Sequence, residues 1–132
     1  PIEILKIKGE ALGVTTPLQF FWASGGLSSF LDNAPTYAVF FELGGSVHKI
    51  NVPMLSNVMT ATGVIPIPHL MAVACGSVFM GANTYIGNGP NFLVKSIAES
   101  RGIKMPSFFG YMLYSGLILI PLFVLISFLF FL

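Results

Sequence analysis

Three long apolar stretches, separated by short polar ones, organise this chain. They cover residues 17–43, 69–101 and 107–132. A straight membrane-spanning helix needs about 20 apolar residues. The last stretch carries no charge from Phe108 onwards, which predicts one spanning helix with a kink at Pro121. The first two stretches are longer than one span, and polar residues interrupt both.

The first apolar stretch is interrupted by Asp32-Asn33-Ala34-Pro35. A charged side chain at the centre of a bilayer costs roughly 2.5–3.5 kcal/mol on insertion scales. Proline removes a backbone donor and disfavours helical geometry in the residue before it. A single kinked helix and a re-entrant hairpin are both compatible with this pattern. We favour the hairpin over residues 17–43, because each arm has only about half the length of a span.

The second apolar stretch is interrupted over residues 81–91, which contain three glycines, three asparagines and one proline. Such a segment does not form an ordinary lipid-facing helix, because it frees backbone groups that need hydrogen-bond partners. We expect a discontinuous transmembrane helix over residues 69–101. Its second half restarts at or before Asn91 and ends at Arg101-Gly102, a sequence typical of a helix C-terminus.

Polar segments connect these stretches. Residues 1–16 form a polar connection, and Thr16 followed by Pro17 predicts a helix start. Residues 44–68 form a second connection, which we expect outside the membrane on the external side. Within it, residues 54–65 are expected to form a short interfacial helix. The polar start and apolar end of the chain also lead us to expect the C-terminal piece of a longer membrane protein.

Basic residues gather before the last apolar stretch, at Lys95, Arg101 and Lys104. Cytoplasmic loops of membrane proteins carry an excess of Lys and Arg. We therefore expect this link to lie in the cytoplasm and the hairpin to enter from the opposite side.

Composition narrows the class of protein. Hydrophobic residues make up 55% of the 132 residues and charged residues only 8%, whereas a soluble domain carries about 25% charged residues. This chain is therefore expected to be an all-α integral membrane protein in contact with the lipid bilayer. Its net charge of +1 and scattered basic residues argue against nucleic acid as a partner, since a nucleic-acid binder needs a basic patch.

An enzyme would need a nucleophile–base pair or a set of metal ligands in one place. The two histidines, His48 and His69, are well separated in the chain, and Cys75 lies in an apolar run where a small packing residue is the expected role. We therefore expect no enzymatic activity. A purely structural membrane subunit is a second alternative. In that case Asp32 only caps the second hairpin arm, and the second interruption is a packing kink.

Two interrupted hydrophobic segments close together indicate the binding site of a secondary transporter. A broken helix offers carbonyl groups at one half-helix end, which coordinate Na⁺, and N–H groups at the other, which bind an anion. Both interruptions are rich in Ser, Thr and Asn, which add neutral oxygen ligands and amide donors. No cofactor is expected besides a sodium ion or a proton as the coupling ion.

Two motifs resemble those of the ion transporter superfamily, namely Ser29-Phe30-Leu31-Asp32-Asn33-Ala34-Pro35-Thr36 and Gly81-Ala82-Asn83-Thr84-Tyr85-Ile86-Gly87-Asn88. The chain is most similar to the branch of citrate transporters and sodium:proton antiporter-like proteins of bacteria. The resemblance implies half of an inverted-repeat transporter: a re-entrant hairpin, a discontinuous helix and a final helix. It also implies a homodimer in the bacterial inner membrane, with an N-terminal repeat and a scaffold completing each transporter.

The resemblance also assigns candidate site residues. The ion- and substrate-binding positions carried over from the motifs are Ser29, Asp32, Asn33, Ala34, Pro35, Thr36, Asn83, Thr84, Gly87, Asn88, Gly89 and Asn91. The candidate sodium ligands among them are Asp32, Asn33, Thr36, Asn83 and Asn88.

The tip of the expected hairpin departs from one part of the superfamily. Dicarboxylate symporters carry a neutral Ser-Asn-Thr there, whereas this chain has the acidic Asp32. A carboxylate disfavours an anionic substrate beside it and suits a cation or proton carrier. From the sequence we therefore expect sodium/proton antiport, with sodium-coupled transport of citrate or a dicarboxylate as the alternative.

Overall fold

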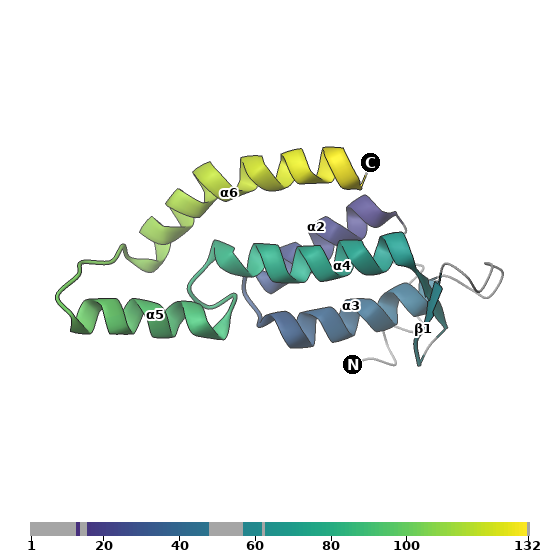
Figure 1. The fold of residues 1–132 in the computed structure, drawn as a ribbon, viewed down its shortest axis with the longest axis horizontal. Helices are drawn as coiled ribbons and strands as arrows, with labels where there is room; N and C mark the ends of the chain where they lie inside the picture. The colour runs from purple at the N-terminus through teal and green to yellow at the C-terminus, as the bar shows by residue number, and fades with distance from the viewer. Residues whose placement is uncertain (1–12, 14–15, 48–56, 62, 132) are drawn as a thin grey trace.

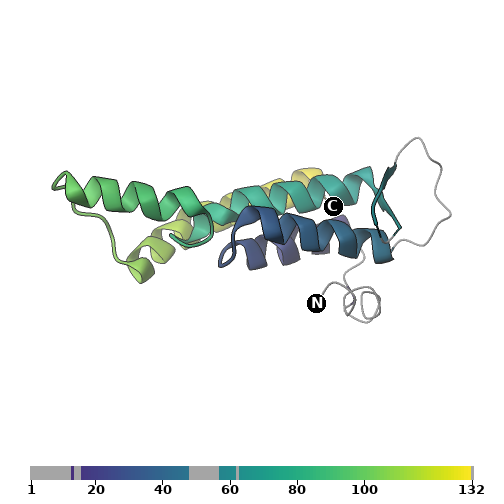
Figure 2. The ribbon, with the colours of Figure 1, turned by 90° about the horizontal axis from the view of Figure 1, so that it is seen from below.

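The structure, a computed structural model, describes residues 13, 16–47, 57–61 and 63–131 and is mostly helical. Helices α2 and α3 form a hairpin; α4 lies beside both, α5 extends away from this bundle, and α6 returns across it (Figure 1). The elements in chain order are α2 (Pro17–Ser28), α3 (Asn33–Val47), β1 (Asn57–Met59), β2 (Val64–Pro66), α4 (Ile67–Phe79), the 3₁₀ helix η3 (Met80–Asn83), α5 (Gly89–Ser100) and α6 (Phe108–Phe130). Figure 2 shows the same elongated arrangement from below.

Local sequence signals set the start of α2. The Thr16 hydroxyl accepts a hydrogen bond from the Gln19 backbone N–H at 3.3 Å, and the Gln19 side chain accepts one from the Thr16 N–H at 3.1 Å. This reciprocal pair is a capping box, and Pro17 occupies the first helical position, where its missing N–H has no cost. The helix start expected from Thr16-Pro17 is confirmed.

The end of α5 is also as expected. Gly102 has a φ of +82°, a conformation that a residue with a Cβ adopts only at a cost. Its N–H donates to the Glu99 carbonyl at 3.1 Å, and the Ile103 N–H donates to the Ala98 carbonyl at 3.0 Å. These two bonds form a Schellman motif, which satisfies the last carbonyls of the helix.

The hairpin turns earlier than the sequence indicated. The connection between α2 and α3 covers residues 29–32, and Asn33, Ala34 and Pro35 already belong to the first turn of α3. The expectation that Asn33-Ala34-Pro35 forms part of the break is wrong, because proline is tolerated in the first helical turn, where its N–H has no helical acceptor. Helix α3 also continues to Val47, beyond the expected end at residue 43.

A small β-hairpin replaces the helix expected over residues 54–65, of which 54–56 lie outside the described residues. Strands β1 and β2 pair antiparallel, with Val58 opposite Ile65. The turn between them is closed by a backbone bond from the Thr60 N–H to the Gly63 carbonyl at 2.8 Å. β-Branched residues favour strands, and Ile65 is fully buried against α3. The chain is therefore mostly helical rather than all-α.

Small residues bring α2 and α4 into close contact. Ser24, Gly25 and Ser28 on α2 face Ala72 and Gly76 on α4, and all of them are buried. A Cβ added at Gly76 would overlap the backbone of α2. Small residues spaced four apart are a common way for helices to pack closely in membranes. Phe20 and Phe21, both fully buried, fill the space beside this contact.

Within the described residues, one helix is long and apolar enough to cross a membrane, namely α6. Its 23 residues span about 34 Å at 1.5 Å per residue, which is enough to cross a bilayer core of about 30 Å. Pro121 lies inside this helix without ending it, and the helix axis bends along its length (Figure 1). Phe131, just beyond α6, stacks on Phe21 of α2 at 5.0 Å between ring centroids.

Candidate functional site

The tip of the α2–α3 hairpin lies against the end of α4 and η3, where the second helix is interrupted. The Ser28 hydroxyl donates to the Ser77 carbonyl, and the Ser29 hydroxyl donates to the Met80 carbonyl at 3.1 Å. In return, the Asn83 side-chain amide donates to the Ser29 hydroxyl at 3.0 Å. Asn33 and Asn83, which mark the two interruptions, are 50 residues apart in the sequence. In the structure the two interruptions form one polar contact.

Asn33 lies at the centre of this contact, at the start of α3. Its terminal amide atom is 3.0 Å from the Ser28 hydroxyl, 2.9 Å from the Ser77 carbonyl and 3.1 Å from the Gly87 carbonyl. When its nitrogen faces them, the amide can share its two N–H donors among these three acceptors, so we assign that orientation. Turning the amide would place its oxygen among three other oxygens. In that second arrangement the Ser28 hydroxyl can donate to the Asn33 oxygen at 3.0 Å, while the Ser77 and Gly87 carbonyl oxygens face it.

Two glycines allow the close approach of the tip and the interruption. A Cβ at Gly81 would overlap the Asn33 amide. A Cβ at Gly87 would lie 2.6 Å from the Gly81 carbonyl oxygen and 2.8 Å from the carbonyl oxygens of both Ser28 and Ser29. Thus any side chain at these positions would push the tip away from the interruption.

Thr84 links the same two segments. Its hydroxyl donates to the Ser29 carbonyl and accepts the Gly87 N–H at 3.0 Å. Thr84 is 1% exposed, so its hydroxyl stabilises the turn of the non-helical segment between η3 and α5.

Two buried oxygens in the contact have no hydrogen-bond partner within the described part of the chain: the Ser77 hydroxyl and the Asn83 side-chain oxygen. A buried polar atom without a partner costs about 1–3 kcal/mol. Both belong to residues that also bond the hairpin tip through Ser28 and Ser29. Together with the Asn33 amide they supply neutral side-chain oxygens at this contact, the atom type that hard cations prefer. We call these three side chains the oxygen cluster.

The backbone carbonyls of the interruption are occupied by side-chain donors. Every carbonyl from Met80 to Thr84 accepts one, although a helix end leaves its last carbonyls without helical partners. The donors, in order, are Ser29, Asn91, Tyr111, Ser115 and again Asn91, at 3.1, 3.0, 2.7, 2.7 and 3.1 Å. The Ser77 carbonyl likewise accepts the Ser28 hydroxyl.

Asp32 lies beside this oxygen cluster, at the exposed end of the hairpin. Its carboxylate accepts the Asn33 N–H at 2.8 Å, and its backbone carbonyl accepts the Thr36 hydroxyl at 3.0 Å. The carboxylate therefore caps α3, while the Thr36 hydroxyl is buried and already bonded. Ala34 and Pro35 are exposed in the first turn of α3.

The remaining predicted positions lie at the start of α5. Asn88 is the N-cap residue of that helix, with no side-chain capping bond, and Gly89 is its exposed first residue. Asn91 instead reaches back, and its amide joins the Gly81 and Thr84 carbonyls. The structure thus brings Ser29, Asn33, Asn83, Thr84 and Gly87 together, and it places the others at the two helix starts.

Sequence reasoning missed four contributors: Ser28, Ser77, Tyr111 and Ser115. Ser28 directly precedes the motif, whereas Ser77 is a lone serine in an apolar helix and resembles a packing residue. The Tyr111 ring stacks on Tyr85, at 4.3 Å between centroids, and its hydroxyl donates to the Ala82 carbonyl in the interruption. This hydrogen bond can be found only from the tertiary structure.

Ionisable ligands are not gathered at this contact. Over the described ranges, no three residues among His, Cys, Asp and Glu lie together in a group that fits a metal ion. The oxygen cluster consists of hydroxyl, amide and carbonyl groups, none of which titrates near neutral pH.

In the structure, interrupted helices meet at their polar ends beside an apolar helix that is long enough to span a membrane. This arrangement is typical of membrane transport proteins. The family described as "Putative citrate transport" matches residues 2–131, and the chain belongs to this family. The match confirms the transporter class and the resemblance to citrate transporters expected from the sequence. The chain matches none of the curated proteins and none of the solved structures with which it was compared.

Proposed function

We propose that the chain is part of a secondary active transporter that couples the movement of sodium to that of a citrate-like carboxylate. In this proposal α2 and α3 are the re-entrant hairpin, α4 to α5 is the broken transmembrane helix, and α6 is the last span. The rest of the transporter, with the inverted repeat and the partner protomer, completes the site. The observation that supports this proposal most directly is the contact of the hairpin tip with the interruption around Asn33.

The neutral oxygen cluster supports sodium as the coupling ion. Sodium binds at broken helices through carbonyl and side-chain oxygens, whereas proton coupling needs a group that titrates. The Ser77 hydroxyl and the Asn83 oxygen lack partners among the described residues, and the Asn33 amide oxygen joins them when the amide turns. Sodium binding would then replace the Asn33 hydrogen bonds with ion contacts.

Two helix starts near the same contact support a carboxylate substrate. Helix α3 begins at Asn33 and α5 begins at Gly89, and the N-terminus of each helix is the positive end of its dipole. A bound sodium ion would add positive charge beside them and offset the negative charge of Asp32. The family description, which names citrate, agrees with this substrate class.

Sodium/proton antiport is the second candidate, and one observation favours it. Asp32 is an exposed carboxylate next to Asn33 in the chain, so it is placed to take up and release a proton beside the oxygen cluster. In an antiporter this carboxylate is essential. In the carboxylate symporter it is a helix cap, which asparagine replaces equally well.

The test uses the full transporter in proteoliposomes, as wild type and as Asp32→Asn. We expect an inward sodium gradient to drive accumulation of labelled citrate in both forms, with rates within about twofold because Asn keeps the cap. A sodium-driven pH change in the lumen that is absent from Asp32→Asn, without citrate uptake, would support the antiporter instead. Citrate uptake driven by a pH gradient alone, with no response to sodium, would contradict sodium as the coupling ion.

A further inference from the structure

Helix α6 contacts the interruption from a different segment of the chain than the hairpin. Tyr111 and Ser115 lie four residues apart, and therefore on one face of α6. The Tyr111 hydroxyl donates to the Ala82 carbonyl at 2.7 Å, and the Ser115 hydroxyl donates to the Asn83 carbonyl at 2.7 Å. Two adjacent carbonyls of the interruption are thus bound by two side chains of the last helix.

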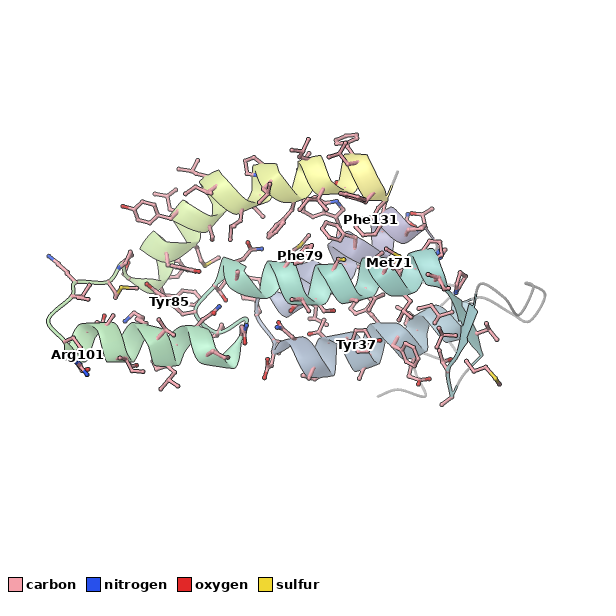
Figure 3. The ribbon with its side chains drawn as sticks, viewed as in Figure 1. Tyr37, Met71, Phe79, Tyr85, Arg101 and Phe131 are labelled. Carbon is pink, nitrogen blue, oxygen red and sulfur yellow. The ribbon has the colours of Figure 1, made fainter. Side chains whose placement is uncertain are left out.

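Tyr85 adds a third connection between the same segments. Its ring stacks on Tyr111, and its hydroxyl donates to the Pro106 carbonyl, just before α6, at 2.9 Å. The Lys95 ammonium of α5 lies 5.4 Å from the centre of the Tyr85 ring, within the range of a cation–π contact. Figure 3 shows Tyr85 between α5 and the first turns of α6.

Asn83 connects α6 to the hairpin. Ser115 holds its backbone carbonyl, while its side chain reaches the Ser29 hydroxyl at the hairpin tip and leaves its amide oxygen without a partner among the described residues. A shift of the Asn83 backbone therefore moves an oxygen of the cluster directly. The position of α6 and the geometry of the cluster are linked through this one residue.

We propose that Tyr111 and Ser115 are positioning residues, which set the affinity of the transporter for its coupling cation without touching that cation. This inference rests on the proposed sodium-coupled function. The two hydroxyls hold the interruption in the conformation in which the Asn83 amide bonds Ser29 at the hairpin tip. Loss of either donor leaves a carbonyl of the interruption unsatisfied and lets this segment relax.

The experiment measures the sodium concentration for half-maximal citrate uptake, and the maximal rate, for Tyr111→Phe and Ser115→Ala in proteoliposomes. Tyr114→Phe is the control for the first change, since Tyr114 is 61% exposed on the same helix. Ser127→Ala is the control for the second, since Ser127 is buried and donates to Val124 of its own helix at 2.8 Å. Ser115→Thr keeps the hydroxyl and tests rescue.

We expect Tyr111→Phe and Ser115→Ala to raise the half-maximal sodium concentration about tenfold, equivalent to about 1.4 kcal/mol. The maximal rate, both controls and Ser115→Thr should stay within about twofold of wild type. Equal sodium affinity in the Tyr111 and Ser115 variants and their controls would overturn the inference, even if thermal stability falls. A wild-type transporter whose uptake ignores sodium would instead overturn the proposed function, and the inference with it.

Discussion

Asn33 is the residue at which the hairpin and the interrupted helix meet. Its amide reaches acceptors from three segments, Ser28, Ser77 and Gly87, and either its nitrogen or its oxygen can face them. Buried polar contacts of this kind are stable only when every member has a partner. In the proposed sodium-coupled function, a cation would favour the orientation with the oxygen inward, so Asn33 would link cation binding to the contact between the hairpin tip and the interruption.

Gly87→Ala tests how closely the tip must approach the interruption. The added Cβ would lie within 2.6–2.8 Å of three carbonyl oxygens, so the segments must separate. We expect sodium-driven citrate uptake to fall at least tenfold, since overpacking costs about 1–3 kcal/mol at a tight contact. The measurement is the initial uptake rate per reconstituted transporter.

Gly89→Ala is the matched control for this change, because a Cβ at Gly89 meets nothing within 4 Å. Its uptake rate should remain near that of wild type. Equal loss in both variants would show that the glycines matter for helix restart and not for the contact with the tip.

The sequence alone identified part of this site. Asn33, Asn83 and Thr84 were predicted because they belong to the two motifs that resemble those of the ion transporter superfamily. Their partners could not be predicted, because Ser77 and Ser115 are single serines in apolar helices and acquire a role only through contacts with distant segments. Asp32, the other prominent candidate, lies at an exposed position at the start of α3.

Among the secondary-structure elements, local sequence signals were sufficient to predict helix ends but not to predict the structure of the connections between helices. The Thr16-Pro17 start and the Gly102 stop depend on neighbouring residues alone. The β-hairpin of β1 and β2 was mistaken for a helix, because its stability depends on the burial of Ile65 against α3. Pro35 was misplaced in the break because proline is compatible with both a break and a first helical turn.

The packing of α2 against α4 gives a prediction about stability. A Cβ at Gly76 would overlap the Phe21 carbonyl and the Ser24 hydroxyl, so Gly76→Ala should separate the two helices. We expect a loss of about 1–3 kcal/mol in stability, seen as a lower midpoint of thermal unfolding in detergent. Gly26→Ala, whose Cβ meets nothing within 4 Å, should change the midpoint little, and an equal change in both would contradict close packing at Gly76.

At the scale of the whole molecule, large apolar surfaces lie outside the α2–α4 core. Most of α6 is exposed, and α5 has no buried residue in the described structure; its Phe92, Leu93 and Ile97 are all more than half exposed. Contiguous apolar surface on this scale needs lipid or further protein to cover it. This agrees with a membrane protein of the family that the chain belongs to.

In the proposed function, the contact around Asn33 binds the coupling cation. Equilibrium binding of radioactive sodium to the purified transporter tests it most directly, with wild type, Asn33→Ala and Asp32→Asn compared after each is shown to be monodisperse. We predict saturable binding to wild type and Asp32→Asn, and a loss of at least about tenfold in affinity in Asn33→Ala. Unchanged affinity in Asn33→Ala, or loss of binding confined to Asp32→Asn, would contradict the account.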